Sequence, residues 1–197
     1  MPDTLPAPST ALAALLSRAS VPPRLLQAPG PDDITLGHAV AAALRAPDHG
    51  GLRPSRFVCI EGDARAAFGA VIAASLLRRL PDTPPERLDL ERAKPLRAPL
   101  LVAAGAALRP GHRIPLWEQQ ATAAAGVMNF LNAIEAQGFG AIWLSSGALD
   151  DAEVKRALGF VETDMLLGWI YVGTPAPDRP RPPRPDPDGF WRRWAPA

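Results

Sequence analysis

The stretch of residues 117–147 constrains the fold of this 197-residue chain more than any other segment. After a polar lead-in, its pattern predicts a helix over residues 120–137. An apolar stripe repeats along this helix at three- and four-residue spacing, formed by Ala124, Val127, Met128, Leu131 and Ile134. Small apolar residues extend the stripe around most of the cylinder, which is typical of a helix in a core or between subunits. Taken alone, the pattern favours packing in the core of the chain itself.

The end of this helix and the strand after it are also predicted by local sequence. Gly138 is expected to stop the helix, because glycine adopts the left-handed cap conformation without steric cost. The apolar run over residues 141–145 then indicates a short buried strand, and Ser145, Ser146 and Gly147 turn the chain out of it. The polar end of this strand could line a functional site.

Helical and strand patterns alternate along the rest of the chain without an internal repeat. Helices are predicted over residues 10–17, 63–80, 85–94 and 150–158. A further helix is predicted from Asp32 or Asp33 to Leu44, with an aspartate as its cap. Further strands are predicted over residues 57–60, 100–107 and 165–173. The strands are continuously apolar, which indicates a sheet covered on both faces in a three-layer or α+β domain. We expect a flexible N-terminus over residues 1–9, a single domain over 10–174 and a proline- and arginine-rich tail over 175–197.

Composition excludes several classes of protein. With 21 Lys and Arg against 20 Asp and Glu, the formal charge is +1, which gives no electrostatic case for nucleic-acid binding. Cys59 lies in an apolar run and is predicted to be a small buried hydrophobe. The histidines lie far apart in sequence, which argues against a zinc site. The N-terminal residues do not resemble a secretory signal, and no apolar run is long enough to cross a bilayer. We expect a cytoplasmic protein without membrane contact.

The generic catalytic motifs in the sequence lie in the wrong structural context. Gly138 and Gly140 precede a strand instead of following one, which is the reverse of a dinucleotide-binding turn. Ser145 has no histidine near it in sequence that would suggest a hydrolase triad. The remaining candidates are polar residues in loops, suited to an anionic ligand: Arg18, Ser20, Arg45 and His49. Alternatively, these four residues are ordinary exposed loop residues.

Several blocks in order resemble the nitroreductase superfamily. They are R-A-S near the N-terminus, R-A-P-D-H after the second helix, then W-E-Q, G-F-G-A-I-W and Y-V-G-T-P. The sequence is most similar to the short, single-domain, YdjA-like bacterial branch, over residues 11–177. The resemblance implies an α+β fold with a central mixed or antiparallel sheet flanked by helices, in an intertwined homodimer. It also implies an NAD(P)H oxidoreductase that uses flavin mononucleotide (FMN) to reduce a nitroaromatic, quinone or similar small-molecule electron acceptor by ping-pong hydride transfer.

The resemblance also assigns cofactor-binding residues. The R-R-S segment of the family falls on Arg18, Ala19 and Ser20, and its next arginine and histidine fall on Arg45 and His49. Its W-R-S/T segment falls on these three positions: Trp143, Leu144 and Ser145. No catalytic side chain is expected, because the flavin carries the hydride chemistry, and no metal is expected.

The chain departs from the family pattern at Ala19 and Leu144, where arginines are usual, and at Ser55, where tryptophan is usual. Other arginines could replace the missing cations, and the candidates are Arg53, Arg56, Arg192 and Arg193. The same departures leave open a second interpretation, a non-redox ligand-binding protein on this scaffold. A scaffold protein that binds a partner through its tail is a third.

The helix at 120–137 and the tail are expected to form the dimer interface. The helix is too apolar to be covered easily by one small domain, and its small residues permit close approach of a second helix. The tail ends in bulky aromatic residues that would bury a large area if they docked on a partner. These residues are Phe190, Trp191 and Trp194.

Overall fold

The computed structural model describes residues 10–178 and 183–196, so the predicted flexible segment over residues 1–9 lies outside the described part of the chain. Its centre is a five-stranded sheet in which every pairing is antiparallel. The strands are β1 (Leu26–Gln27), β2 (Ser55–Glu61), β3 (Leu100–Ala106), β4 (Gly140–Leu144) and β5 (Met165–Pro175). Strand β5 lies between β3 on one side and β4 and β1 on the other, and β2 forms the far edge. The predicted α+β class is confirmed.

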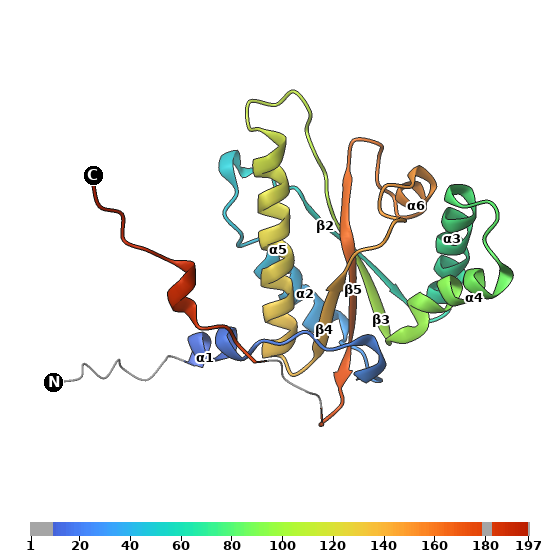
Figure 1. Cartoon of the computed structure of the whole chain (residues 1–197), viewed down its shortest axis with the longest axis horizontal. Coiled ribbons are helices and arrows are strands. Elements are labelled where there is room, and N and C mark those ends of the chain that lie inside the picture. Colours follow the sequence, from blue (N-terminus) through green and yellow to red (C-terminus); the bar gives the residue numbers. More distant parts are fainter. Residues whose placement is uncertain (1–9, 179–182, 197) are drawn as a thin grey trace.

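Helices cover both faces of this sheet. They are α1 (Thr10–Ser17), α2 (Asp33–Ala43), α3 (Ala64–Arg79), α4 (Pro85–Ala93), α5 (Leu116–Ala136) and α6 (Ala152–Ala157). Short 3-10 turns are η1 (Pro23–Leu25), η2 (His49–Gly51), η3 (Lys94–Arg97) and η4 (Pro187–Phe190). Helices α2 and α5 pack on one face, and α3, α4 and α6 lie on the other (Figure 1).

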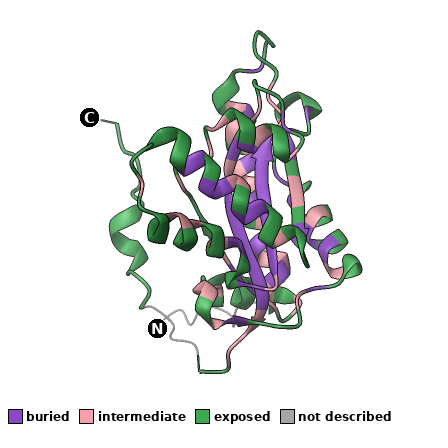
Figure 2. Ribbon diagram, turned by 90° about the vertical axis from the view of Figure 1, so that its right-hand side faces the viewer, coloured by how far each residue is buried: buried purple, intermediate pink, exposed green. Residues whose placement is uncertain are grey.

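The central strand β3 shows why the sheet needs helices on both faces. All of its residues are buried. Leu100 and Val102 pack toward α2 and α5, whereas Leu101 and Ala103 pack toward α3. Successive side chains of a strand point to opposite faces, so a continuously apolar strand is stable only with helices on both sides. The buried residues accordingly lie along the middle of the molecule (Figure 2).

Helix α5 begins earlier than its apolar pattern predicts, at Leu116 directly after Pro115. Proline suits the start of a helix because it has no backbone N–H to satisfy there. The predicted end is confirmed, since Gly138 has a φ of +89°. The predicted stripe is wrong in part. Ala123, Val127, Phe130, Leu131 and Ile134 are buried, whereas Met128 is 42% exposed and lies on the outer side of the helix.

The other predicted helices and strands all occur, with boundaries within a few residues. The Asp32 carboxylate accepts a hydrogen bond from the Thr35 N–H at 2.8 Å and so caps α2 as its sequence indicates. Asp151 caps α6 in the same manner. Strand β1 was not predicted, because two residues are too short to give a periodic signal.

The interpretation of Cys59 as a buried hydrophobe is wrong, because its side chain is exposed. It lies on β2, which pairs only with β3 and therefore leaves one edge of the sheet open. Desolvation by surrounding atoms, followed by the negative charges of Glu61 and Asp33, raises the pKa of the Cys59 thiol although its surface is reached by solvent. A thiol with a raised pKa is a poor nucleophile at neutral pH.

Candidate functional site

The segment over residues 18–20 is fixed by its backbone against the end of α5. Ala19 is buried, and its N–H donates to the Glu135 carboxylate at 3.0 Å. The next backbone bond runs from the Val21 N–H to the Ala141 carbonyl of β4 at 2.9 Å. Arg18 is half-buried, and its carbonyl accepts a hydrogen bond from the guanidinium of Arg184 in the tail. The Arg18 guanidinium forms no ion pair with a described carboxylate, so it is available to an anionic ligand.

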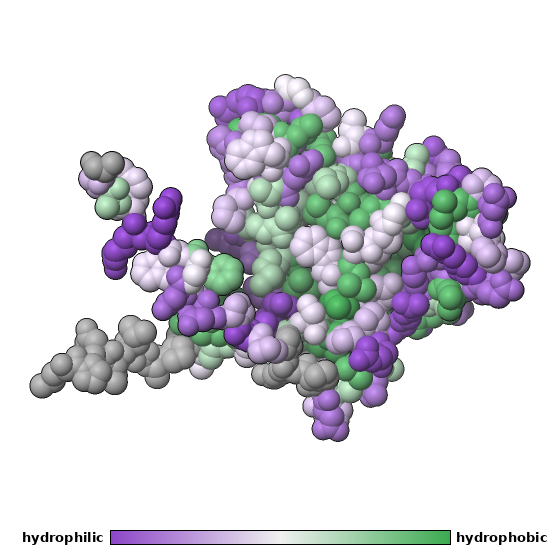
Figure 3. All heavy atoms as spheres, viewed as in Figure 1, coloured by the Kyte–Doolittle hydropathy of each residue, from purple (hydrophilic) through white to green (hydrophobic). Residues whose placement is uncertain are grey.

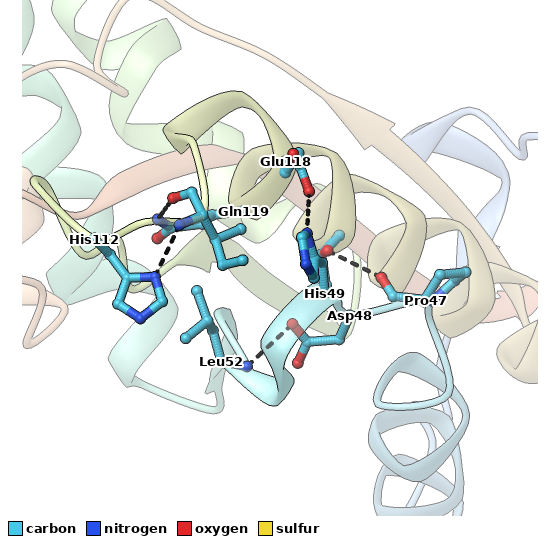
Figure 4. Close-up of polar contacts among 9 residues, drawn as sticks. Pro47, Asp48, His49, Leu52, His112, Glu118 and Gln119 are labelled. Carbon is cyan, nitrogen blue, oxygen red and sulfur yellow. Dashed lines mark hydrogen bonds and ion pairs between the residues drawn. The ribbon is translucent and has the colours of Figure 1, made fainter.

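Arg45 and His49 follow α2 and lie at the other end of α5. Arg45 is exposed. His49 Nδ1 lies 2.7 Å from the Glu118 carboxylate (Figure 4). A carboxylate only accepts hydrogen bonds, so Nδ1 carries the proton and Nε2 is left for another partner. The Thr122 hydroxyl donates to the Pro47 carbonyl at 2.9 Å and holds this loop against α5.

These two predicted parts of the site do not meet within one chain. Ala19 contacts Glu135 near the end of α5, whereas His49 contacts Glu118 near its start. Glu118 and Glu135 are 17 positions apart along the helix, a rise of about 25 Å. The Arg18 and His49 segments therefore lie near opposite ends of α5.

Trp143, Leu144 and Ser145 lie at the end of β4, and their side chains diverge. The Trp143 indole donates to the Leu167 carbonyl at 3.1 Å and lies against Gly168. Leu144 and Ser145 line a cavity of about 150 Å³ on the α3 side of the sheet, together with Trp169 and Tyr171. Of the three predicted residues, Leu144 and Ser145 line this cavity, whereas Trp143 does not.

The same cavity contains two cations that the sequence reasoning missed, Lys94 and Arg97 of η3. Lys94 pairs with Glu91, whereas Arg97 forms no ion pair with a described carboxylate. Burial raises the pKa of the Tyr171 hydroxyl and outweighs the nearby positive charge of Arg97, which lowers it, so the hydroxyl stays protonated at neutral pH. Two cations in the four residues 94–97, just before a buried strand, were the sequence signal for this site.

The arginines expected to replace the missing cations lie elsewhere. Arg53 and Arg56 line a separate groove between α2 and β2. Arg192 and Arg193 lie on the exposed tail, where the guanidinium of Arg193 is 5.8 Å from the ring centre of Trp191. Lys94 and Arg97 are the cations beside Leu144 and Ser145.

Two further polar residues near the start of α5, Gln119 and His112, have structural partners. The Gln119 side chain is buried and bonds to backbone groups of Arg109 and Ile114, and His112 accepts from the Ile114 N–H at 3.1 Å (Figure 4). Within residues 10–178 and 183–196, no three His, Cys, Asp or Glu side chains are placed to hold a metal ion. No helix in those residues has the length and apolar character needed to cross a membrane.

Comparison with known proteins identifies the family of the fold. The model of the nitroreductase family matches residues 15–174. The proposed NAD(P)H nitroreductase YdjA of Escherichia coli (strain K12) is 36% identical over 165 residues, which cover 84% of this chain and 88% of that protein. A proposed NAD(P)H nitroreductase of Haemophilus influenzae (strain Rd) is 30% identical over 150 residues, covering 76% of this chain and 80% of that protein.

Solved structures with low sequence identity share the fold. A nitroreductase-like protein from Bacillus cereus superposes with a TM-score of 0.80 at 17% identity, covering 97% of this chain and 99% of the other. A nitroreductase with bound FMN from Bacteroides fragilis gives a TM-score of 0.72 at 17% identity, covering 95% of this chain and all of the other.

Proposed function

The chain belongs to the nitroreductase family, and from this membership we propose that it is an FMN-dependent NAD(P)H oxidoreductase that reduces a nitroaromatic, quinone or similar electrophile. The observation that carries the proposal is the family match over residues 15–174. Two relatives named as proposed NAD(P)H nitroreductases and a similar structure with bound FMN support it.

The residues present fit FMN chemically. The guanidiniums of Arg18, Arg45 and Arg97 form no ion pairs with described carboxylates, and unpaired guanidiniums bind phosphate oxygens with paired hydrogen bonds. Ser20 is exposed next to Arg18, and the Ser145 hydroxyl and Arg97 line the cavity beyond β4. Donors of this kind suit the ring carbonyls of a flavin. We assign Arg18, Ser20 and Ser145 to cofactor binding, with Arg45 and His49 from a second copy.

When bound, FMN supplies the hydride chemistry, so the protein itself needs no general acid or base. The residues of this chain position the cofactor and shield it from water. Trp169 and Phe68 form the apolar wall of the cavity and pack edge to face, with ring centres 5.5 Å apart. Since one site then serves the nicotinamide and the acceptor in turn, we expect ping-pong kinetics.

The separation of Arg18 from Arg45 and His49 supports a homodimer. If two copies pack with their α5 helices antiparallel, Arg18 of one protomer approaches His49 of its partner. The outer side of α5 suits such a contact, because Ala121, Met128 and Trp117 are exposed on it. Apolar residues lie over the middle of this face, where α5 and β4 run (Figure 3). An obligate interface of this kind is expected to bury more than about 2,000 Å² in total.

The tail is the second part of the proposed interface. Phe190, Trp191 and Trp194 are 79%, 61% and 82% exposed. The three leucines of α1 are also exposed, and both segments extend on the α5 side of the molecule (Figure 1). Docking of these aromatic and aliphatic groups on a partner would remove them from water.

The function is tested by the colour of the purified protein. Bound FMN gives a yellow protein that bleaches when NAD(P)H is added without oxygen. A colourless protein that also fails to bind added FMN contradicts the proposal and favours a non-redox binding protein. The exposed Leu144 at the rim of the cavity is the observation that supports this second candidate, since an apolar rim admits ligands other than flavin. Submicromolar affinity for FMN decides against it.

A further inference from the structure

A second concavity lies on the α2 side of the molecule, away from the cavity beside Ser145. We name it the arginine groove. It has a volume of about 630 Å³ and lies between the end of α2, the start of β2 and the loop after β3. Its charged lining consists of Arg53, Arg56 and Arg109. Its volume falls within the range of sites that hold small molecules, about 300–1,000 Å³.

The three arginines of the groove lack carboxylate partners. None of their guanidiniums forms an ion pair within the described residues, and no aspartate or glutamate lines the groove. Arg56 donates instead to the backbone carbonyls of Arg53 at 2.8 Å and Ser55 at 2.9 Å. Because the whole chain has a formal charge of only +1, three unpaired cations in one groove are a local concentration of positive charge. Such a site favours an anionic ligand.

Hydrogen bonds from the backbone to Asp48 hold the segment that carries Arg53. The Asp48 carboxylate accepts from the Leu52 N–H at 3.1 Å (Figure 4). It also accepts from the Arg53 N–H at 2.6 Å. Arg53 has a φ of +49°, a left-handed conformation that is unfavourable for a residue with a Cβ atom. Non-glycine residues held in this region cluster at functional sites. Asp48 forms no ion pair with these arginines within the described residues.

Arg109 is held by the buried side chain of Gln119. The Arg109 N–H donates to Gln119 Oε1 at 2.8 Å, and Gln119 Nε2 donates to the Arg109 carbonyl at 3.2 Å. Gln119 is only 2% exposed, so this pair of bonds is protected from water. The loop that carries Arg109 is thus fixed at the mouth of the groove.

The uncharged part of the groove is apolar. Val40, Leu44 and Phe57 line it, and the Phe57 ring stacks on Phe130 at 4.9 Å. Ser55, where a family member usually has tryptophan, is a small lining residue and leaves this space open. A ligand that fits both parts carries phosphate for the guanidiniums and a flat, partly apolar body for the floor. Arginine also stacks on aromatic rings.

We propose that the arginine groove binds the phosphorylated adenosine of NADPH and selects it over NADH. The assignment to NADPH rests on the proposed function; the assignment to a phosphorylated nucleoside rests on the groove alone. NADPH differs from NADH by a 2′-phosphate, and an arginine is the usual partner of that group. Leu44 lines the groove. The next residue in the chain, Arg45, belongs to the proposed flavin site.

Calorimetric titration tests the groove without any turnover. Adenosine 2′,5′-bisphosphate is expected to bind the wild-type protein, and the double variant Arg53→Gln/Arg109→Gln is expected to bind it at least tenfold more weakly. The control Arg87→Gln removes an exposed arginine of α4 and should leave the affinity unchanged. No binding to the wild type, or equal binding by the double variant, overturns the site. Equal affinity for inorganic phosphate overturns recognition of the nucleoside.

Steady-state kinetics then identify the source of the phosphate. The ratio of kcat/KM for NADPH to that for NADH is expected to exceed one and to fall at least tenfold in the double variant, but not in Arg87→Gln. An unchanged ratio, together with lost bisphosphate binding, overturns the assignment to NADPH. If the protein binds the bisphosphate but neither binds FMN nor oxidises either nicotinamide, the proposed function fails and the nucleoside-phosphate site stands.

Discussion

At the scale of single residues, the chain separates charges that stabilise the fold from charges left free for a ligand. Asp151 is an example of the first kind. It caps α6 and receives two hydrogen bonds from the Arg78 guanidinium, at 2.7 and 3.1 Å. Arg18 is an example of the second kind, because its backbone is held and its guanidinium has no carboxylate partner among the described residues. Substitutions at these two residues should therefore affect different measurements.

Replacement of Asp151 by asparagine should destabilise the fold. Burial alone would raise the pKa of this carboxyl, but the hydrogen bonds from Arg78 and the Val154 N–H outweigh it and lower the pKa from 3.8 to about 2. A lowered folded pKa stabilises the native state above pH 4 and loses that contribution as the pH falls toward 2. Asp151→Asn should lower the unfolding free energy at pH 7 by about 2 kcal/mol and flatten its acid dependence. Asp89→Asn, at an exposed ion pair with Arg92, should change it by less than about 1 kcal/mol in the same denaturant titration.

Arg18→Ala should weaken FMN binding and leave the fold intact. A charged hydrogen bond typically contributes about 1.5–3 kcal/mol, so the dissociation constant should rise about 10- to 150-fold. His49→Ala should have a smaller effect, because one ring nitrogen is already occupied by Glu118. Fluorescence titration of FMN measures both, and thermal unfolding serves as the control for folding. Full FMN occupancy of Arg18→Ala under dilution would place the phosphate site elsewhere.

At the scale of elements, α5 connects the parts of the molecule. Its buried side packs on α2 and the sheet through Val127, Phe130 and Ile134, and its two ends contact the two proposed parts of the cofactor site. This packing is close at Gly126, where an added Cβ atom would lie 2.8 Å from Ser55 Oγ and 3.2 Å from the Ala43 carbonyl. Glycine at this position therefore lets α5 approach both α2 and β2.

A matched pair of glycine substitutions tests this packing. Gly126→Ala should lower the unfolding free energy by about 1–3 kcal/mol, the usual cost of overpacking. Gly37→Ala, in α2, meets no atom within 4 Å and should raise it by about 0.5–1 kcal/mol, because alanine favours a helix. Both are measured by chemical denaturation at one protein concentration. Equal effects of the two substitutions would show that the contact at Gly126 is loose.

At the scale of the whole molecule, the proposed homodimer rests on the separation of Arg18 from His49 and on the exposed apolar face of α5. Light scattering at low micromolar concentration should give about twice the chain mass of 20.9 kDa. Met128→Lys places a charge at the middle of the outer side of α5 and should yield monomers with weakened FMN binding, since a buried unpaired charge opposes association. Leu90→Lys, at an exposed apolar position on α4 away from α5, should remain dimeric. A wild-type monomer that binds FMN would contradict both the interface and the shared site.

Local sequence determined most of the elements of this protein. Asp32 and Gly138 set the ends of their helices through side-chain and backbone chemistry that involves only a few neighbouring residues. The continuously apolar strands also determined that both faces of the sheet are covered, because each face has to be shielded from water.

The tertiary structure decided what depends on contacts distant in sequence. Cys59 is exposed because β2 lies at an edge of the sheet, which no local pattern specifies. Met128 faces outward because packing against α2 and β3 selects one side of an almost uniformly apolar helix. Arg97 adjoins Ser145 only because η3 and β4 meet across the folded sheet, whereas Arg18 and His49 are held apart by the length of α5.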